Sequence, residues 1–363
     1  MSEPSVHQNT RRRGMIVPLA MVGMLLLLTM SVALQQAAWR SARGARTQWD
    51  SQRGLYSADA ALVRAVATWR ADSMAATPIG ERVEWIEPDV DGWTTRVSLA
   101  RTGTLSAAAL AVTQRSRAVV PMPVVRRADA IGDVTRIQRT VVYALRLDPP
   151  SLPLLAAVTV LGDVALDAAT IDGRDQVVVY EPTRDDCGPW RDSASVAALA
   201  SVTRSVRAAP LLFGAAMTVP AVAASRTRFD SGFARIVARA RPVVLTPSGG
   251  IPSTASWRAS VIQQVAAVMV GDTSQYVGLL AVDGDLVVSG ALRVDGLLVV
   301  RGAVDVSAGT LDVRGALVIR DVSALGSQLG VGVHVTYAPC LAGRALVAVA
   351  TPNRLPFGVW NSP

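Results

Sequence analysis

The sequence predicts an α+β protein: a long N-terminal transmembrane and amphipathic helix, an antiparallel β-sheet, and then a discontinuous β-solenoid with a partly helical insertion. Three observations predict this organisation. An uncharged apolar stretch near the N-terminus passes without a break into an amphipathic helical pattern. Runs of alternating apolar and polar residues follow this helix. Towards the C-terminus, glycines recur every six residues with the same alternation between them.

Composition excludes several kinds of chemistry. The chain has 363 residues, two histidines and a formal net charge of +8, and it contains no lysine. It therefore lacks a Walker-type lysine, a Schiff-base lysine and a Ser–Lys dyad, and two histidines make no His-rich metal site. The arginines are scattered and are not interleaved with aromatic residues, which argues against nucleic-acid binding. We expect no enzyme, catalytic residue, cofactor, metal, nucleic acid or small-molecule substrate.

The N-terminal helix combines two patterns. Residues 1–14 form a basic leader, and residues 15–34 follow without a charge. At 1.5 Å per residue this second stretch covers about 30 Å, the thickness of the hydrocarbon core of a bilayer. Residues 35–73 then carry apolar side chains at helical spacing among Arg, Gln and Asp, with Trp39 suited to a membrane interface and Trp69 to packing. We expect one helix, with a transmembrane first half and a packed second half.

The start of this helix resembles that of a known family. Three arginines, Gly14, Met15 and a leucine-rich span are similar to the N-terminus of type IV pilins and type II secretion pseudopilins, in particular to the PilX-type minor pilin start. The resemblance implies that a prepilin peptidase cleaves after Gly14 and leaves Met15 as the mature N-terminus. The family usually has Glu five residues after the cut, where this chain has Leu19. That departure shifts the interpretation towards a minor subunit.

The resemblance implies a structural role in the cell envelope. The chain would be a minor pilin-like or pseudopilin-like subunit of a type IV filament or secretion system, acting by helix packing and by display of a β-rich body. It would cross the bacterial inner membrane once, with the N-terminus cytoplasmic and the bulk periplasmic or on an extracellular filament. Its expected partners are the lipid bilayer and other pilin-like subunits or assembly machinery. An uncleaved single-span anchor and a secretory signal cut near Ala33 are the alternatives.

Two kinds of strand pattern follow the helix. Residues 82–148 contain alternating extended runs and predict an antiparallel sheet against the second half of the helix. A different alternation, with glycine at the corners, occupies residues 156–180 and returns over residues 275–350. The intervening residues 181–274 are predicted to be a partly helical insertion. Helical periodicity within it lies near residues 193–208, 228–240 and 256–270.

The glycine repeat is the strongest pattern in the chain. Alternation between successive glycines turns both apolar side chains of a unit to the same face. Six units with one extra residue predict a β-solenoid, in which glycine permits tight stacking or a positive φ at the corners. An antiparallel meander with regular turns is the alternative. The expected corner residues are Gly284, Gly290, Gly296, Gly302, Gly309 and Gly315.

The repeat resembles the short-repeat β-helices of bactofilin-like proteins. That resemblance implies a second function: a membrane-tethered bactofilin-like scaffold, or an adhesion protein, without pilin processing. A strand at residues 331–336 and a short helix within 340–350 are expected to cap the open end of the solenoid. The two cysteines, Cys187 and Cys340, could pair in an oxidising envelope compartment, and two independent buried thiols are the alternative.

Overall fold

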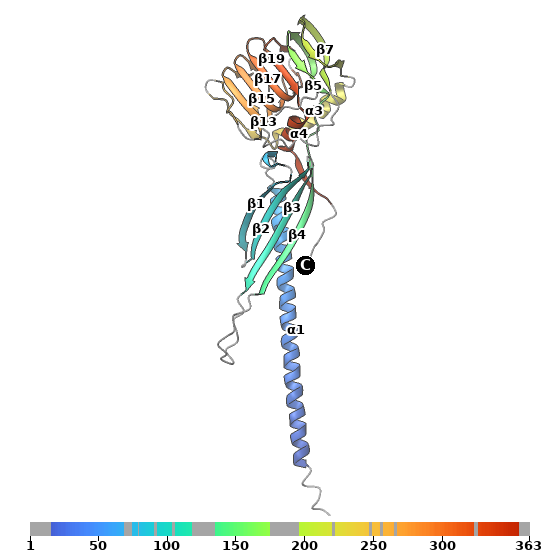
Figure 1. Ribbon diagram of the computed structural model, residues 1–363, viewed down its shortest axis with the longest axis vertical. Helices are drawn as coiled ribbons and strands as arrows, with labels where there is room; N and C mark the ends of the chain where they lie inside the picture. Colours follow the sequence, from blue (N-terminus) through green and yellow to red (C-terminus); the bar gives the residue numbers. More distant parts are fainter. Residues whose placement is uncertain are drawn as a thin grey trace, which may run out of the picture.

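A computed structural model shows a long helix, a small antiparallel sheet beside its upper half, and a large curled parallel sheet beyond both (Figure 1). The predicted α+β class is confirmed. The structure describes residues 16–68, 75–78, 80–90, 93–103, 106–117, 135–174, 196–219, 222–246, 249–254, 257–264, 267–322 and 326–355.

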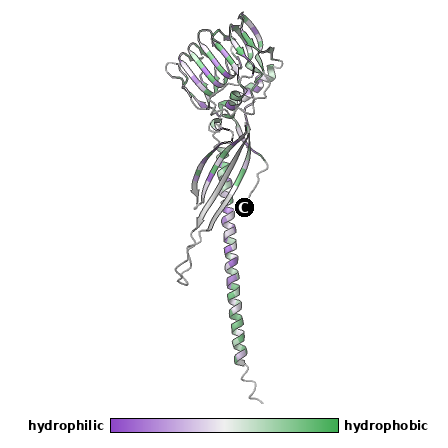
Figure 2. Ribbon diagram, viewed as in Figure 1, coloured by the Kyte–Doolittle hydropathy of each residue, from purple (hydrophilic) through white to green (hydrophobic). Residues whose placement is uncertain are grey.

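Helix α1 runs without interruption from Ile16 to Ala67, over 52 residues. At 1.5 Å per residue it is about 78 Å long. Pro18 lies in its first turn, where the missing N–H costs no helical hydrogen bond. Figure 2 shows that the residues of the helix change along its length from mainly hydrophobic to a mixture of hydrophobic and hydrophilic. The expectation of one continuous helix is confirmed over these residues.

The antiparallel sheet lies against the second half of α1. Its order is β1-β2-β3-β4-β20, so the last strand comes from near the C-terminus and pairs with β4. Alternate side chains of β2 and β4 are buried towards the helix, as the alternation predicted. The strands are β1 (Arg82–Val90), β2 (Trp93–Gly103), β3 (Ser106–Arg117), β4 (Thr135–Asp148) and β20 (Thr351–Arg354).

The second sheet is parallel throughout and curls into a coil. Its central turns each contribute one long strand, bent at a glycine, and one short strand. The long strands are β13 (Thr273–Asp283), β15 (Ala291–Val300) and β17 (Thr310–Ile319). The short ones are β14 (Leu286–Val288), β16 (Val304–Val306) and β18 (Ser327–Leu329). Equivalent strands of successive turns pair in register.

The bends are made by a column of stacked glycines. Gly278 pairs with Gly296 and Gly296 pairs with Gly315, so one turn takes 18 residues and the next 19. Their φ angles are 122°, 142° and 141°, a region that side chains with a Cβ rarely adopt. Three of the six-residue units therefore make one turn of the coil.

The coil is discontinuous in sequence, but strands of the coil lie within the predicted insertion of residues 181–274. Its first-synthesised part, β5 (Ala156–Asp167), pairs with β17 and β18. The next strands wind away from that junction: β6 (Thr170–Asp172), β7 (Ala197–Ala208), β8 (Leu211–Phe213) and β9 (Ala216–Thr218). The chain then returns at the other end with β10 (Arg241–Pro242), β11 (Arg258–Gln263) and β12 (Val268–Val270), and winds back to β19 (Val333–Tyr337). Entry and exit thus meet near β4 and β20.

Two helices cover one side of the coil. They are α3 (Val222–Val237) and α4 (Pro339–Val347). The strand halves that follow the stacked glycines, residues 279–282, 297–300 and 316–319, are buried on both faces; we call them the covered strip. Their inward side chains fill the coil, and their outward ones join a second core shared with α4, α3 and α1.

Three expectations need correction. The helices predicted near residues 193–208 and 256–270 are strands β7, β11 and β12. These apolar stretches are short, and parallel pairing with β5, β13 and β14 satisfies their backbone groups, which outweighs a weak helical pattern. Residues 181–274 are consequently not separate from the coil, although α3 occupies part of them.

The predicted C-terminal helix exists as α4, but it contacts β13, β15 and β17 on the side of the coil. It does not cap an end. The apolar side chains of α4 instead pack on the outward apolar side chains of the covered strip, which removes both from water.

Candidate assembly surface along helix α1

The first part of α1 is an exposed apolar rod. Every described side chain from Val17 to Trp49 is exposed, apart from the half-buried Gly23. The stretch up to Trp39 carries no charge, and α1 is long and apolar enough to cross a membrane. The uncharged part, from Val17 to Trp39, is about 35 Å long. A continuous apolar surface of this size needs lipid or other helices around it.

The second part of α1 packs on its own chain. Four side chains, of Ala58, Ala61, Leu62 and Ala65, are at most 3% exposed, and α1 contacts β2, β3 and β4. Three of the four are alanines, so the helix backbone approaches the sheet closely. Because these positions recur at spacings of three and four, only one face of the helix is buried.

A polar link joins this packed face to two strands. The Tyr143 hydroxyl on β4 donates a hydrogen bond to the Asp59 carboxylate on α1. The Arg354 guanidinium on β20 lies 3.8 Å from the centre of the Tyr143 ring. Burial, and then the hydrogen bond to Asp59, raise the pKa of Tyr143 to about 12. The link fixes the helix against both the early and the late part of the chain.

A second link joins the segment that follows α1 to the coil. Arg344 on α4 donates from Nε to the carbonyl oxygen of Ala75 at 2.7 Å, and its second amino group donates to that of Ala76 at 3.3 Å. The guanidinium also lies 4.7 Å from the centre of the Trp257 ring, next to β11. Arg344 is 7% exposed, so this charge-assisted link is shielded from solvent. It holds the coil next to the end of α1.

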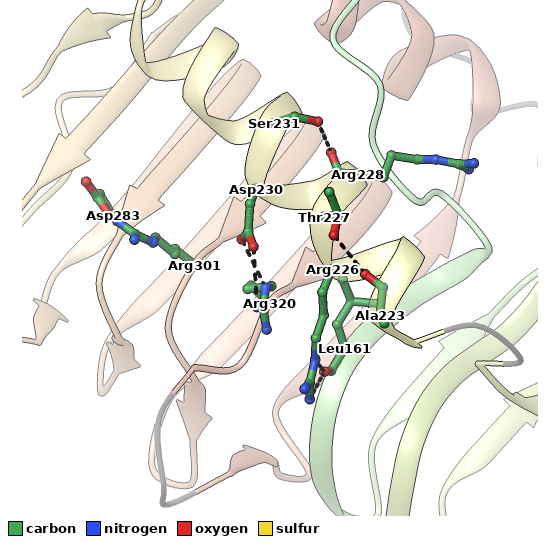
Figure 3. Close-up of polar contacts among 10 residues, drawn as sticks. All are labelled: Leu161, Ala223, Arg226, Thr227, Arg228, Asp230, Ser231, Asp283, Arg301 and Arg320. Carbon is green, nitrogen blue, oxygen red and sulfur yellow. Dashed lines mark hydrogen bonds and ion pairs between the residues drawn. The ribbon is translucent and has the colours of Figure 1, made fainter.

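A groove of about 450 Å³ lies between α3 and the coil (Figure 3). Arg320 donates to Asp230 at 3.0 Å, and Arg301 donates to Asp283 at 2.9 Å. Arg226 donates to the carbonyl oxygen of Leu161 at 2.9 Å and 3.1 Å. Both arginines that line the groove are thus paired, and the Arg320–Asp230 and Arg226–Leu161 contacts fix α3 to the coil. Within the described ranges no cluster of His, Cys, Asp or Glu could hold a metal ion.

The residues predicted for function lie in different parts of the structure. Gly14 and Met15, at the predicted cleavage point, lie outside the described residues. Leu19 is 77% exposed on the apolar rod. Cys340 lies at the start of α4 and is not a free thiol. Cys187 lies outside the described residues, so its pairing with Cys340 stays a prediction.

All six predicted corner glycines lie where a side chain would be crowded or strained. Gly284, Gly296 and Gly315 have φ angles of 155°, 142° and 141°. At the other three, a Cβ would come within 3 Å of atoms in the preceding turn. These three are Gly290, Gly302 and Gly309.

Sequence reasoning missed the covered strip and the Asp59–Tyr143 link. A signal for the strip exists, because every third repeat unit is apolar at all four positions after its glycine, as in residues 279–282, 297–300 and 316–319. A strand buried on both faces reads as such a continuous apolar run. No comparable signal marks the Asp59–Tyr143 link, which joins residues 84 positions apart.

Comparison with known proteins places the chain in no family. No family model matches it, and no curated protein matches it. Among solved structures, the competence-associated pilin ComZ from Thermus thermophilus aligns over 81% of this chain and 89% of its own, with 13% identity and a TM-score of 0.21. A TM-score this low does not establish a common fold.

Proposed function

We propose that the chain is a minor pilin-like or pseudopilin-like structural subunit of a type IV filament or secretion system. The observation that carries the proposal is the division of α1. One unbroken helix of 52 residues exposes its uncharged first part and packs one face of its last turns on an antiparallel sheet. A plain membrane anchor does not need that rigid continuity, whereas a subunit that transmits its position through a helical bundle does.

The proposed mechanism is assembly rather than catalysis. Before assembly, the apolar rod lies in the inner membrane with its N-terminus cytoplasmic, and the sheet and coil face the periplasm. During assembly, the rod exchanges lipid for the apolar rods of neighbouring subunits, because both surroundings cover the same side chains. The links made by Asp59–Tyr143 and Arg344 hold the sheet and coil rigidly on the rod, so the body is displayed in a fixed orientation.

Leu19 suggests a position at an end of the filament. In the family that the N-terminus resembles, a carboxylate at this position meets the N-terminal amine of a neighbour. Leu19 offers no charge and is 77% exposed. A subunit without that contact starts or caps a filament rather than repeating along it.

The test is the mass of the protein's N-terminal peptide after recovery from native membranes. The proposal expects a mature chain that begins at Met15, and it expects the variant Gly14→Glu to keep its leader. As a control, Gly44→Glu changes an exposed glycine of α1 and should leave cleavage unchanged. A chain that still begins at Met1, or one cut near Ala33, contradicts the proposal.

A second candidate is a membrane-tethered bactofilin-like scaffold or adhesion protein without processing. The parallel coil favours it, because coils of this type can extend by adding turns. The full chain in detergent, examined by electron microscopy, distinguishes the two functions. Filaments formed through the coil by a chain that keeps its leader would support the scaffold.

A further inference from the structure

Three arginines form a collar immediately after the uncharged part of α1. Arg40, Arg43 and Arg46 are the first charged residues after the start of the helix. All three are exposed, and none forms an ion pair with a described residue. At spacings of three they fall within about one third of the helix circumference. The collar is therefore a concentrated, uncompensated positive surface.

The collar lies at the depth of lipid headgroups. Trp39 precedes it and is 50% exposed, as an aromatic anchor at the edge of the hydrocarbon core would be. If the core ends at Trp39, the three arginines begin about 2, 6 and 11 Å further along the helix. The headgroup layer extends about 5–8 Å beyond the core, and the long arginine side chains can reach back into it.

Arg40 and Arg43 also lie on the side of α1 that carries the sheet, whereas Arg46 lies five turns before the exposed Arg64. Arg40 lies eighteen residues, or five helical turns, before Ala58, and Arg43 lies five turns before Ala61. Both alanines are fully buried against the sheet. Two of the three charges thus point towards the space between the sheet and the membrane.

We propose that Arg40, Arg43 and Arg46 bind the phosphate groups of anionic lipids in the leaflet nearest the folded body. A planar guanidinium makes paired hydrogen bonds to phosphate oxygens. Arginines next to a transmembrane helix are usually found on the cytoplasmic side of the membrane. Here they would lie on the opposite side, and binding to anionic lipids would offset the unfavourable free energy of that placement. The contact holds the body close to the membrane before assembly. The inference requires only that α1 spans a bilayer, and it stands whether or not the leader is cleaved.

The experiment counts lipids that remain on the full chain. The protein in detergent is mixed with equal amounts of phosphatidylglycerol and phosphatidylcholine, and the retained lipids are counted by native mass spectrometry. The wild type is expected to retain more phosphatidylglycerol, with an effect of up to about five-fold per arginine at low salt. This preference should weaken as salt is added.

The matched variants separate the collar from net charge. Arg40→Gln/Arg43→Gln/Arg46→Gln should abolish the preference, whereas Arg96→Gln/Arg207→Gln/Arg228→Gln, which removes three exposed arginines from β2, the coil and α3, should retain it. All six side chains are exposed, so unchanged circular dichroism is expected in both variants. The proposal is overturned if the wild type shows no preference for phosphatidylglycerol. That result is expected if the three arginines bind an acidic protein instead of lipid. It is equally overturned if both variants keep the preference or both lose it.

Discussion

Gly315 stacks directly on Gly296 in the preceding turn of the coil. The two residues pair in register, and a Cβ added to Gly315 would overlap the carbonyl oxygen of Gly296. Gly296 stands in the same relation to Gly278. The backbones of successive turns thus approach so closely at this corner that only glycine fits. This column decides where each long strand bends, and therefore which residues lie in the covered strip.

The variant Gly296→Ala tests the column. We expect it to lower the free energy of unfolding by about 3 kcal/mol, because it adds strain at a φ of 142° and a steric overlap with the preceding turn. Chemical denaturation of the full chain in detergent measures the change. Gly44→Ala is the matched control: a Cβ there meets nothing within 4 Å, so it should be neutral or stabilise α1 by up to about 1 kcal/mol. Equal effects of the two variants would contradict the stacking.

The packing of α1 on the sheet is tested by adjacent alanines. Ala61 is fully buried, whereas Ala60 is exposed. Ala61→Glu should destabilise the sheet by more than about 3 kcal/mol, because it forces a charge into a filled core. Ala60→Glu should cost less than about 0.5 kcal/mol. Hydrogen exchange of the backbone amides of β2 and β4 measures both effects. Similar protection in the two variants would show that the packing of α1 on the sheet does not depend on this helix face.

The variant Tyr143→Phe tests the polar link through pH. The folded state raises the pKa of Tyr143 from 10.0 to about 12, because burial and Asp59 favour the neutral phenol. The resulting stabilisation is therefore complete below pH 10 and is lost as the pH rises from 10 to 12. The melting temperature of the wild type should fall as the pH rises from 10 to 12, and that of Tyr143→Phe should fall less. A variant with the same alkaline profile as the wild type would speak against the link.

We predict that Arg204 protects the open end of the coil. It pairs in register with Val164, whose side chain fills the interior of the coil, so the arginine occupies an inward position on the last turn. A charge at such a position discourages the addition of another strand. Arg204→Val should therefore increase concentration-dependent self-association, measured by light scattering. Arg207→Val, a substitution of an exposed arginine on the same strand, should associate less; no difference between them would refute this role.

Sequence patterns predicted those parts of the fold that repeat at short range. The long helix follows from an unbroken apolar stretch, and the coil follows from glycines six residues apart. The strands β7 and β11 were missed because their short apolar stretches fit either a helix or a strand until a neighbouring strand is present. The pairing of β20 with β4 and the Asp59–Tyr143 link join distant residues, and a single sequence carries no signal for such contacts.

The central claim concerns the two ends of one helix, and site-specific photo-crosslinking in native membranes tests it most directly. A photoreactive residue replaces Leu27, which is 70% exposed, or Leu62, which is fully buried. We expect position 27 to crosslink to other subunits that carry apolar N-terminal helices, and position 62 to crosslink only within its own chain. If position 27 yields no protein adducts, or if position 62 reaches other chains as often, α1 is not an assembly helix.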